Sequence, residues 1–173
     1  MKELRQKVAE KHRENVGVDK MDNDKSKNLY KKTDGVLFNY RIIKAEISNL
    51  ELEIEEIKSE IDGVKSVGYE ERTGATNAFN SSVENEVLKK EKLMHKLLRE
   101  KASKQRLVDK VDNALNILDE EEREIIKLRC FDKMGWNKVG ILTNRDGDYC
   151  GRIKRKAINK LSELVWIGKK YTE

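Results

Sequence analysis

The fold of this chain is decided by residues 119–161, which read DEEEREIIKLRCFDKMGWNKVGILTNRDGDYCGRIKRKAINKL. Asp119 and Glu122 have the spacing of a helix capping box, and the acidic first turn suits the positive end of the helix dipole. Asp146 is the expected N-cap of a later, basic helix. Three short helices separated by polar turns predict a helix-turn-helix unit, whose last helix enters the major groove of DNA.

The middle of this segment supplies the turn. Residues 132–135 are of the types that break helices, and Gly135 is available for a positive φ. A helix of about two turns is expected over residues 136–142. Its apolar positions at helical spacing are Trp136, Val139 and Leu142.

The last helix has two different faces. An apolar face at helical spacing is formed by Cys150, Ile153, Ala157, Leu161 and Leu164. The opposite face carries Asp148, Arg152, Arg155 and Asn159, flanked by Gly151 and Lys156. Such a face is either a DNA-contacting surface or simply a solvated basic helix. Its place as the third element of a helix-turn-helix pattern favours DNA.

We therefore predict a DNA-binding site on this unit. Arg152 and Arg155 are expected to contact base edges, because arginine grips guanine bidentately, and Lys156 suits a phosphate or base contact. The residues expected to line the approach to the bases are Gly147, Asp148 and Gly151. The start of the middle helix presents amide groups and the positive dipole end to a phosphate. The expected backbone anchors are Asn137, Lys138, Arg145 and Lys160.

A heptad seam precedes this unit. Its apolar residues, spaced in steps of four and three, are Val36, Tyr40, Ile43, Ile47, Leu50, Ile54, Ile57, Ile61 and Val64. The pattern is typical of a coiled-coil helix. A second helix is expected over 83–118, with a seam that is less regular through its Lys-rich middle. The apolar residues of this second helix include Val87, Met94, Leu97, Leu98, Leu107, Val108, Val111, Leu115 and Leu118.

Charge indicates how the two long helices pack. The first is acidic between residues 46 and 62, and the second is basic between residues 83 and 106. Opposite signs favour an antiparallel hairpin within one chain. A parallel homodimer through the 36–64 seam is the alternative.

Three domains follow from these patterns. Residues 1–28 are a flexible charged segment, and residues 29–118 form a hairpin arm whose loop spans 65–82. Residues 119–173 form the helix-turn-helix DNA-binding domain.

Composition limits the classes of function. The chain has 173 residues, of which 40% are charged, and a net charge of +5, which suits an anionic partner such as double-stranded DNA. No apolar run approaches the length of a membrane span, and the first residues lack the apolar region of a signal peptide. We therefore expect a cytoplasmic protein that does not contact a membrane.

Catalytic and metal chemistry is not expected. Cys130 and Cys150 do not form a C-x-x-C pair, and His12 and His95 are remote in sequence, so neither a metal nor a cofactor is predicted. Both cysteines are expected to be small core residues. No Gly-rich phosphate loop and no nucleophile–base pair occurs, so we expect neither an enzyme nor a small-molecule substrate.

The C-terminal segment resembles the fourth region of bacterial sigma factors, which reads promoter DNA. The matching features are the acidic start, the II-KLR core, the break, the short middle helix and the final KAINKL. The segment departs from the usual pattern at three positions. Thr143, Asn144 and Cys150 stand where leucine, glycine and valine are usual.

The layout of residues 30–165 is similar to that of Gram-positive phage late-transcription activators of the RinA and ArpU type. The resemblance rests on a long helix, a loop rich in Gly, Thr and Ser, the segment SSVENEVLKKE, and a second long helix that leads into LDEEERE. It implies an all-α protein, with a long antiparallel coiled-coil-like hairpin followed by a sigma-factor-like helix-turn-helix. It also implies a sequence-specific transcriptional activator that binds promoter DNA and acts with host RNA polymerase.

Two other functions stay open. The first is a DNA-packaging adaptor like a small terminase subunit, although the DNA-binding unit usually comes first in those proteins. The second is a coiled-coil interaction protein that does not bind DNA. Salt-dependent binding to a duplex would separate this second function from the others. The sequence also leaves open whether the arm holds a second protomer, as in a homodimer, or contacts RNA polymerase.

Overall fold

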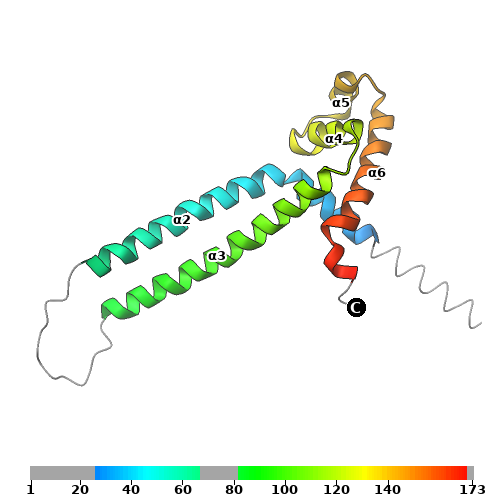
Figure 1. Ribbon diagram of the computed structural model, residues 1–173. Coiled ribbons are helices and arrows are strands. Elements are labelled where there is room, and N and C mark those ends of the chain that lie inside the picture. The colour runs from blue at the N-terminus through cyan, green and yellow to red at the C-terminus, as the bar shows by residue number, and fades with distance from the viewer. Residues whose placement is uncertain (1–25, 67–81, 171–173) are drawn as a thin grey trace, which may run out of the picture. The chain divides into compact units, whose positions relative to one another are not determined.

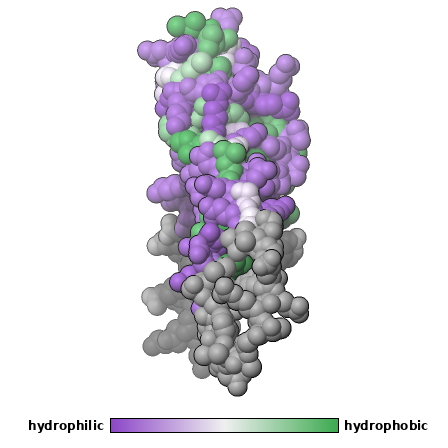
Figure 2. All heavy atoms as spheres, turned by 90° about the vertical axis from the view of Figure 1, so that its left-hand side faces the viewer, coloured by the Kyte–Doolittle hydropathy of each residue, from purple (hydrophilic) through white to green (hydrophobic). Residues whose placement is uncertain are grey.

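The computed structural model describes residues 26–66 and 82–170, and every regular element within these ranges is a helix. The predicted all-α class is therefore confirmed for this part of the chain. The predicted flexible segment over 1–28 and the predicted loop over 65–82 lie almost entirely outside the described residues. Among the residues that Figure 2 colours by hydropathy, hydrophilic side chains predominate, with small hydrophobic patches between them.

The chain divides into two compact units. One unit is Arg41–Asp109. The other combines Met1–Tyr40 with Lys110–Glu173, so residues far apart in the sequence share it. The predicted arm, residues 29–118, differs from this division. Its first residues, up to Tyr40, and its last residues, from Lys110, belong to the same unit as the C-terminal helices.

The Arg41–Asp109 unit is built from two long helices, α2 (Tyr40–Ser66) and α3 (Ser82–Leu115), labelled in Figure 1. Ion pairs join them in reverse order along the chain, so the two helices run in opposite directions. The N–O distances are 2.8 Å for Lys104–Glu46, 2.8 Å for Lys101–Glu51 and 3.3 Å for Lys90–Glu60. All three pairs are partly exposed. Each therefore contributes at most about 1 kcal/mol and acts mainly on orientation.

The predicted seam of α2 is its least exposed side. The described seam residues from Ile43 to Ile61 are buried or half-buried. Two apolar residues off the seam, Ile42 and Leu52, are 47% and 66% exposed. The heptad pattern therefore identifies the packed side of this helix.

The seam of α3 contains lysines. Counted from Val87 in steps of three and four, it passes through Lys90, Lys101 and Lys104, whose side chains are only 26%, 31% and 28% exposed. Long lysine stems can lie along an apolar seam while their ammonium groups reach outward, here to the glutamates of α2. These lysines are the reason why the apolar pattern of α3 is irregular. Leu98, one of the apolar residues of this helix, lies off the seam and is 40% exposed.

The second unit contains the segment that decides the fold. Its helices are α4 (Glu120–Ile126), the π-helix η1 (Lys127–Phe131), α5 (Trp136–Thr143), α6 (Gly147–Val165) and the 3-10 helix η2 (Ile167–Lys170). Both predicted N-caps are confirmed. The Asp119 carboxylate accepts the backbone N–H of Glu122 at 2.8 Å, and the Asp146 carboxylate accepts that of Asp148 at 3.0 Å.

The turns of this unit differ from the prediction in their backbone conformation. Gly135 has a φ of −66°, so the expectation of a positive φ there is wrong. Lys133 takes the left-handed conformation in that turn, with a φ of 54°. Asn144, which follows α5, has a φ of 52°, and asparagine tolerates this conformation because its short polar side chain bonds locally.

One cluster of core residues in this unit joins α4, α5 and α6. Ile125, Val139 and Cys150 are fully buried, and the partly buried residues packed against them are Leu128, Met134, Trp136 and Ile153. Cys130 is also fully buried, so the prediction that both cysteines are core residues is confirmed. Burial raises the pKa of the Cys130 thiol to about 11. Neutral thiols are poor nucleophiles, so this cysteine is a packing residue.

Two leucines predicted to face the core do not. Leu142 and Leu164 are 52% and 38% exposed, so these two assignments are wrong. Leu142 lies in the last turn of the short helix α5, where little of the chain remains to cover it.

A helix over residues 26–38 completes the second unit, and the sequence patterns did not reveal its packing. The indole N–H of Trp166 donates a hydrogen bond to the Thr33 hydroxyl at 2.9 Å. The Lys154 ammonium lies 2.7 Å from the Asp34 carboxylate. These contacts place residues 26–38 beside α6.

The contacts of residues 26–38 cover a second side of α6. Ile158, which lies outside the predicted apolar face of that helix, is fully buried, and so is Leu37 of the N-terminal helix. The helix α6 is therefore enclosed on two sides, and its remaining exposed surface is narrow.

The turn between α5 and α6 leaves no room for a side chain at position 140, which is glycine. A Cβ at this position would lie 2.7 Å from the backbone oxygen of Arg145, and the Arg145 amide donates to the Gly140 carbonyl at 2.9 Å. Gly140→Ala should therefore destabilise the unit by about 1–3 kcal/mol, because backbone atoms must move. Gly151→Ala is the matched control, since its Cβ would meet nothing within 4 Å. Urea unfolding measures both, and equal stability of the two variants would contradict this account of the turn.

Candidate nucleic-acid interface

The exposed face of α6 carries four of the ten residues predicted to bind DNA, together with Asn159. Asp148, Arg152, Arg155, Lys156 and Asn159 are all exposed. On the opposite side the fully or almost fully buried residues are Cys150, Ala157 and Leu161. The helix is therefore strongly amphipathic, and the cations of its outer face are accessible to an anionic partner.

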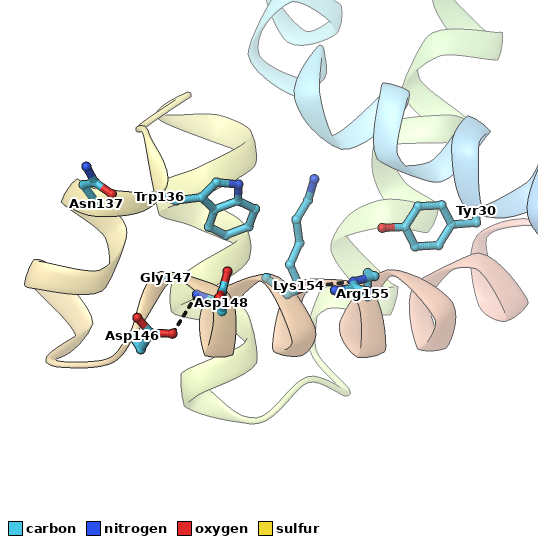
Figure 3. Close-up of a pocket in the computed structure, with 9 residues that line it drawn as sticks. Tyr30, Trp136, Asn137, Asp146, Gly147, Asp148, Lys154 and Arg155 are labelled. Carbon is cyan, nitrogen blue, oxygen red and sulfur yellow. Dashed lines mark hydrogen bonds between the residues drawn. The ribbon is translucent and has the colours of Figure 1, made fainter.

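A shallow cavity of about 480 Å³ lies beside this face (Figure 3). Its lining residues are Tyr30, Trp136, Asn137, Asp146, Gly147, Asp148, Gly151, Lys154 and Arg155. The cavity therefore brings together five of the predicted site residues, namely Asn137, Gly147, Asp148, Gly151 and Arg155. The other five, which do not line it, are Lys138, Arg145, Arg152, Lys156 and Lys160.

The beginnings of α5 and α6 meet at this cavity. Trp136 and Asn137 come from the first turn of α5, and Gly147 and Asp148 come from the first turn of α6 (Figure 3). Asp146 caps α6, whereas no side chain of a described residue caps α5. The first amide groups of α5 are therefore available to an external acceptor, and the dipole of the helix favours an anion there.

Two cations line the cavity, and they differ in their exposure and in their partners. Lys154 is held by Asp34, and its side chain is only 14% exposed, so it serves the packing of residues 26–38. Arg155 is exposed and faces outward. Tyr30 lies close to both, and its pKa is raised by burial and by the charge of Asp34, against the opposing effect of Lys154 and Arg155.

A glutamate of α4 restrains one predicted anchor. The Arg145 guanidinium lies 3.0 Å from the Glu121 carboxylate, which also accepts the Tyr149 hydroxyl at 3.2 Å. The guanidinium carbons of Arg145 and Arg152 lie 5.5 Å and 5.9 Å from the centre of the Tyr149 ring. Arg145 is thus already paired within the unit, whereas Arg152 rests on an aromatic ring and forms no ion pair with a described residue.

A second glutamate of α4 holds Lys160. Glu122 is 2% exposed, and both of its carboxylate oxygens accept hydrogen bonds from the Lys160 ammonium, at 2.6 and 2.7 Å. Lys156 lies farther from the same carboxylate, at 3.9 Å. The predicted DNA anchor Lys160 therefore also has an internal partner. The sequence did not identify this partner, because Glu122 is one of several consecutive acidic residues in α4.

Sequence signals for the missed residues do exist. Glu122 precedes Ile125 and Ile126 by three and four residues, the spacing of one helix face, so its burial follows from the burial of those two isoleucines. The contribution of Tyr30 and Asp34 has no comparable signal. It depends on the tertiary packing of residues 26–38, which no local pattern predicts.

Two further kinds of feature are absent from the described residues. Among them there is no cluster of three His, Cys, Asp or Glu side chains that could hold a metal ion. None of the helices in the described ranges has the length and apolar character that a membrane crossing needs. The exposed cations of α6 and the start of α5 therefore remain the distinctive features.

Comparison with known proteins gives one match. The model of a family described as "Protein of unknown function (DUF722)" matches residues 29–163, which include α2 to α5 and nearly all of α6. No curated protein and no solved structure matches the chain.

The pairing of Lys160 with Glu122 predicts a stability effect. Lys160→Met would leave the buried carboxylate with only the distant Lys156 as a partner, which should cost roughly 3 kcal/mol of unfolding free energy. Lys156→Met is the control, because its side chain is 65% exposed and should change stability by less than about 0.5 kcal/mol. Denaturant unfolding of both variants is the measurement. A Lys160→Met protein as stable as the parent would show that the pair does not hold α4 to α6.

Proposed function

The chain belongs to the DUF722 family, and we propose that it is a sequence-specific DNA-binding protein. In this proposal α5, its turn and α6 form a helix-turn-helix with α6 as the recognition helix, and α2 with α3 forms an antiparallel hairpin arm. One observation carries the proposal. The exposed face of α6 presents Arg152, Arg155 and Lys156, and Arg155 lines the same cavity as the uncapped start of α5.

The bases are contacted from the outer face of α6. Arg152 and Arg155 are one helical turn apart and exposed, which suits contacts with successive base pairs in the major groove. Asp148, at the start of the same face, suits the exocyclic amino group of cytosine. Gly151 lies between these side chains and has no neighbour that a Cβ would meet within 4 Å, so its lack of a side chain leaves room for the DNA.

The backbone is contacted at the start of α5. The amide groups of its first turn and the side chains of Asn137 and Lys138, both exposed, are placed for a phosphate. Arg145 and Lys160 have internal carboxylate partners, Glu121 and Glu122. We therefore assign Arg145 and Lys160 to the structure of the unit rather than to the DNA contact.

The biological role that we infer is activation of transcription. This step rests on the resemblance of the C-terminal segment to sigma-factor region four and of the whole layout to phage late-transcription activators. The arm then presents a surface to host RNA polymerase or holds a second protomer. Transcription in vitro with bacterial RNA polymerase, on a template that carries the selected binding site, separates an activator from a protein that only binds DNA.

Readout by α6 predicts a loss of sequence preference. Arg152→Ala or Arg155→Ala should cost about 1–3 kcal/mol on the preferred sequence and relax the preference at one base position. Lys58→Ala is the control, because it removes a positive charge from the exposed surface of α2. Binding of a panel of single-base variants of the site measures the preference. If both α6 variants kept the parent's preference, α6 would not be the recognition helix.

The approach of DNA to Gly151 predicts opposite effects on stability and binding. Gly151→Ala should stabilise α6 by up to about 1 kcal/mol, because alanine is the better helix former. The same methyl group should weaken DNA binding, since it stands where the duplex approaches the backbone. Unfolding and duplex titrations of one preparation measure both quantities. A variant that is more stable and binds as tightly as the parent would refute a close approach at this residue.

A further inference from the structure

A row of cations runs along the outer side of α3. Opposite its seam, residues spaced by three and four form a row consisting of Lys89, Lys92, Lys96, Arg99, Ser103 and Arg106. We call the five cations of this row the α3 basic face. All five are exposed, and the row contains neither an acidic nor an apolar residue.

The α3 basic face has no internal partners among the described residues. None of its five cations forms a hydrogen bond or an ion pair with another described residue. The lysines of the α3 seam differ, because Lys90 and Lys104 pair with glutamates of α2 and also with Glu86 and Glu100. These carboxylates therefore pair with lysines of the seam, and the positive charges of the outer row have no such partner among the described residues.

The acidic side chains of α3 are engaged elsewhere. Glu86 and Glu100 lie in the pairs just described, and Asp109 accepts a hydrogen bond from Gln105 at 2.8 Å. Lys92, His95, Lys96 and Arg99 together line a shallow hollow of about 400 Å³. A hollow enclosed by cations and exposed to solvent suits an anionic group.

The geometry of the row fits a linear polyanion. Lys89 and Arg106 are 17 positions apart, which is about 25 Å along a helix that rises about 1.5 Å per residue. A DNA strand carries one phosphate per roughly 3.4 Å of helix axis, so such a row could follow the backbone over about seven base pairs. A straight helix with charges on one side matches an extended line of phosphates better than it matches a single compact anion.

We propose that the α3 basic face binds the phosphate backbone of double-stranded DNA, as a second contact that has no sequence preference. This inference rests on the proposed function, because it assigns a further part of the chain to the same ligand. The arm thereby increases the number of phosphate contacts, while the choice of sequence stays with α6.

Two other occupants fit the observations less well. An anionic membrane surface is bound by helices that insert one continuous apolar face, whereas the exposed leucines beside this row, Leu88 and Leu93, lie on opposite flanks of it. A second copy of the chain would have to supply carboxylates. The exposed acids on the outer side of α2 are Glu55, Glu56 and Asp62, which lie within eight residues and cover only a part of the row.

The test compares two double variants of the full chain. Lys92→Gln/Lys96→Gln removes two charges from the α3 basic face, and Lys44→Gln/Lys58→Gln removes two from the exposed surface of α2. Lys92→Arg/Lys96→Arg keeps the charge. The substituted side chains are exposed, and circular dichroism verifies that each variant is folded.

The measurement is binding to a fluorescent duplex of random sequence over a series of salt concentrations. Each phosphate contact contributes about 0.9 to the slope of log affinity against log salt. The Lys92→Gln/Lys96→Gln variant should therefore lose about 1.8 from that slope and bind at least about tenfold more weakly at 0.1 M salt. The α2 double variant and the Lys→Arg variant should keep the slope of the parent.

Each contrary result overturns the inference in a recognisable way. An unchanged slope for Lys92→Gln/Lys96→Gln, with weaker binding by Arg152→Ala, refutes the α3 basic face and leaves the proposed function intact. A parent protein that does not bind duplex even at 50 mM salt refutes both the proposed function and the α3 basic face. If Lys92→Gln/Lys96→Gln weakened binding to phosphatidylserine vesicles but not to duplex, the face would be assigned to a membrane. Loss of self-association in sedimentation, with unchanged duplex binding, would assign it to a second copy.

Discussion

A buried carboxylate determines how the C-terminal unit is assembled. Glu122 is 2% exposed, and an ionised group at such a position is costly unless it is fully paired. The Lys160 ammonium meets this requirement with two hydrogen bonds and thereby ties α4 to α6. This contact supports the rotation of α6 that its amphipathic pattern favours, in which Arg152 and Arg155 are exposed.

The N-terminal helix is the second constraint on α6. The bond from Trp166 to Thr33 and the ion pair of Lys154 with Asp34 connect residues 26–38 to α6. Just after this helix, Tyr40 stacks on Phe131 of η1, with ring centres 4.6 Å apart. A fragment that begins at the acidic run would leave Lys154 without its partner Asp34 and Trp166 without Thr33. The DNA-binding unit that we propose is therefore not a contiguous segment of the chain.

Local patterns predicted the parts of the fold that depend on neighbours in the sequence. The caps at Asp119 and Asp146, the seam of α2 and the two faces of α6 follow from spacing and residue type alone. The seam of α3 could not be predicted as well, because Lys101 and Lys104 occupy it through their apolar stems. The positive φ at Lys133 had no residue signal, since lysine has no preference for that conformation.

The candidate site divides in the same way. The exposure of Arg152, Arg155 and Lys156 follows from the amphipathic pattern of α6, which needs no knowledge of other helices. The partners of Lys160 and Arg145 lie on α4, and Asp34 lies more than a hundred residues before Lys154. These pairings are set by tertiary contacts, so the sequence alone did not show that Lys160 and Arg145 have carboxylate partners within the unit.

Sequence readout by α6 can be tested by selecting bound duplexes from a random pool with the full chain, over several rounds at about 0.1 M salt. If α6 is the recognition helix, the parent protein enriches one short motif, and a variant changed at Arg155 enriches a different or degenerate motif. Binding without enrichment of any motif would contradict sequence readout, and the absence of duplex binding would contradict the DNA-binding role altogether.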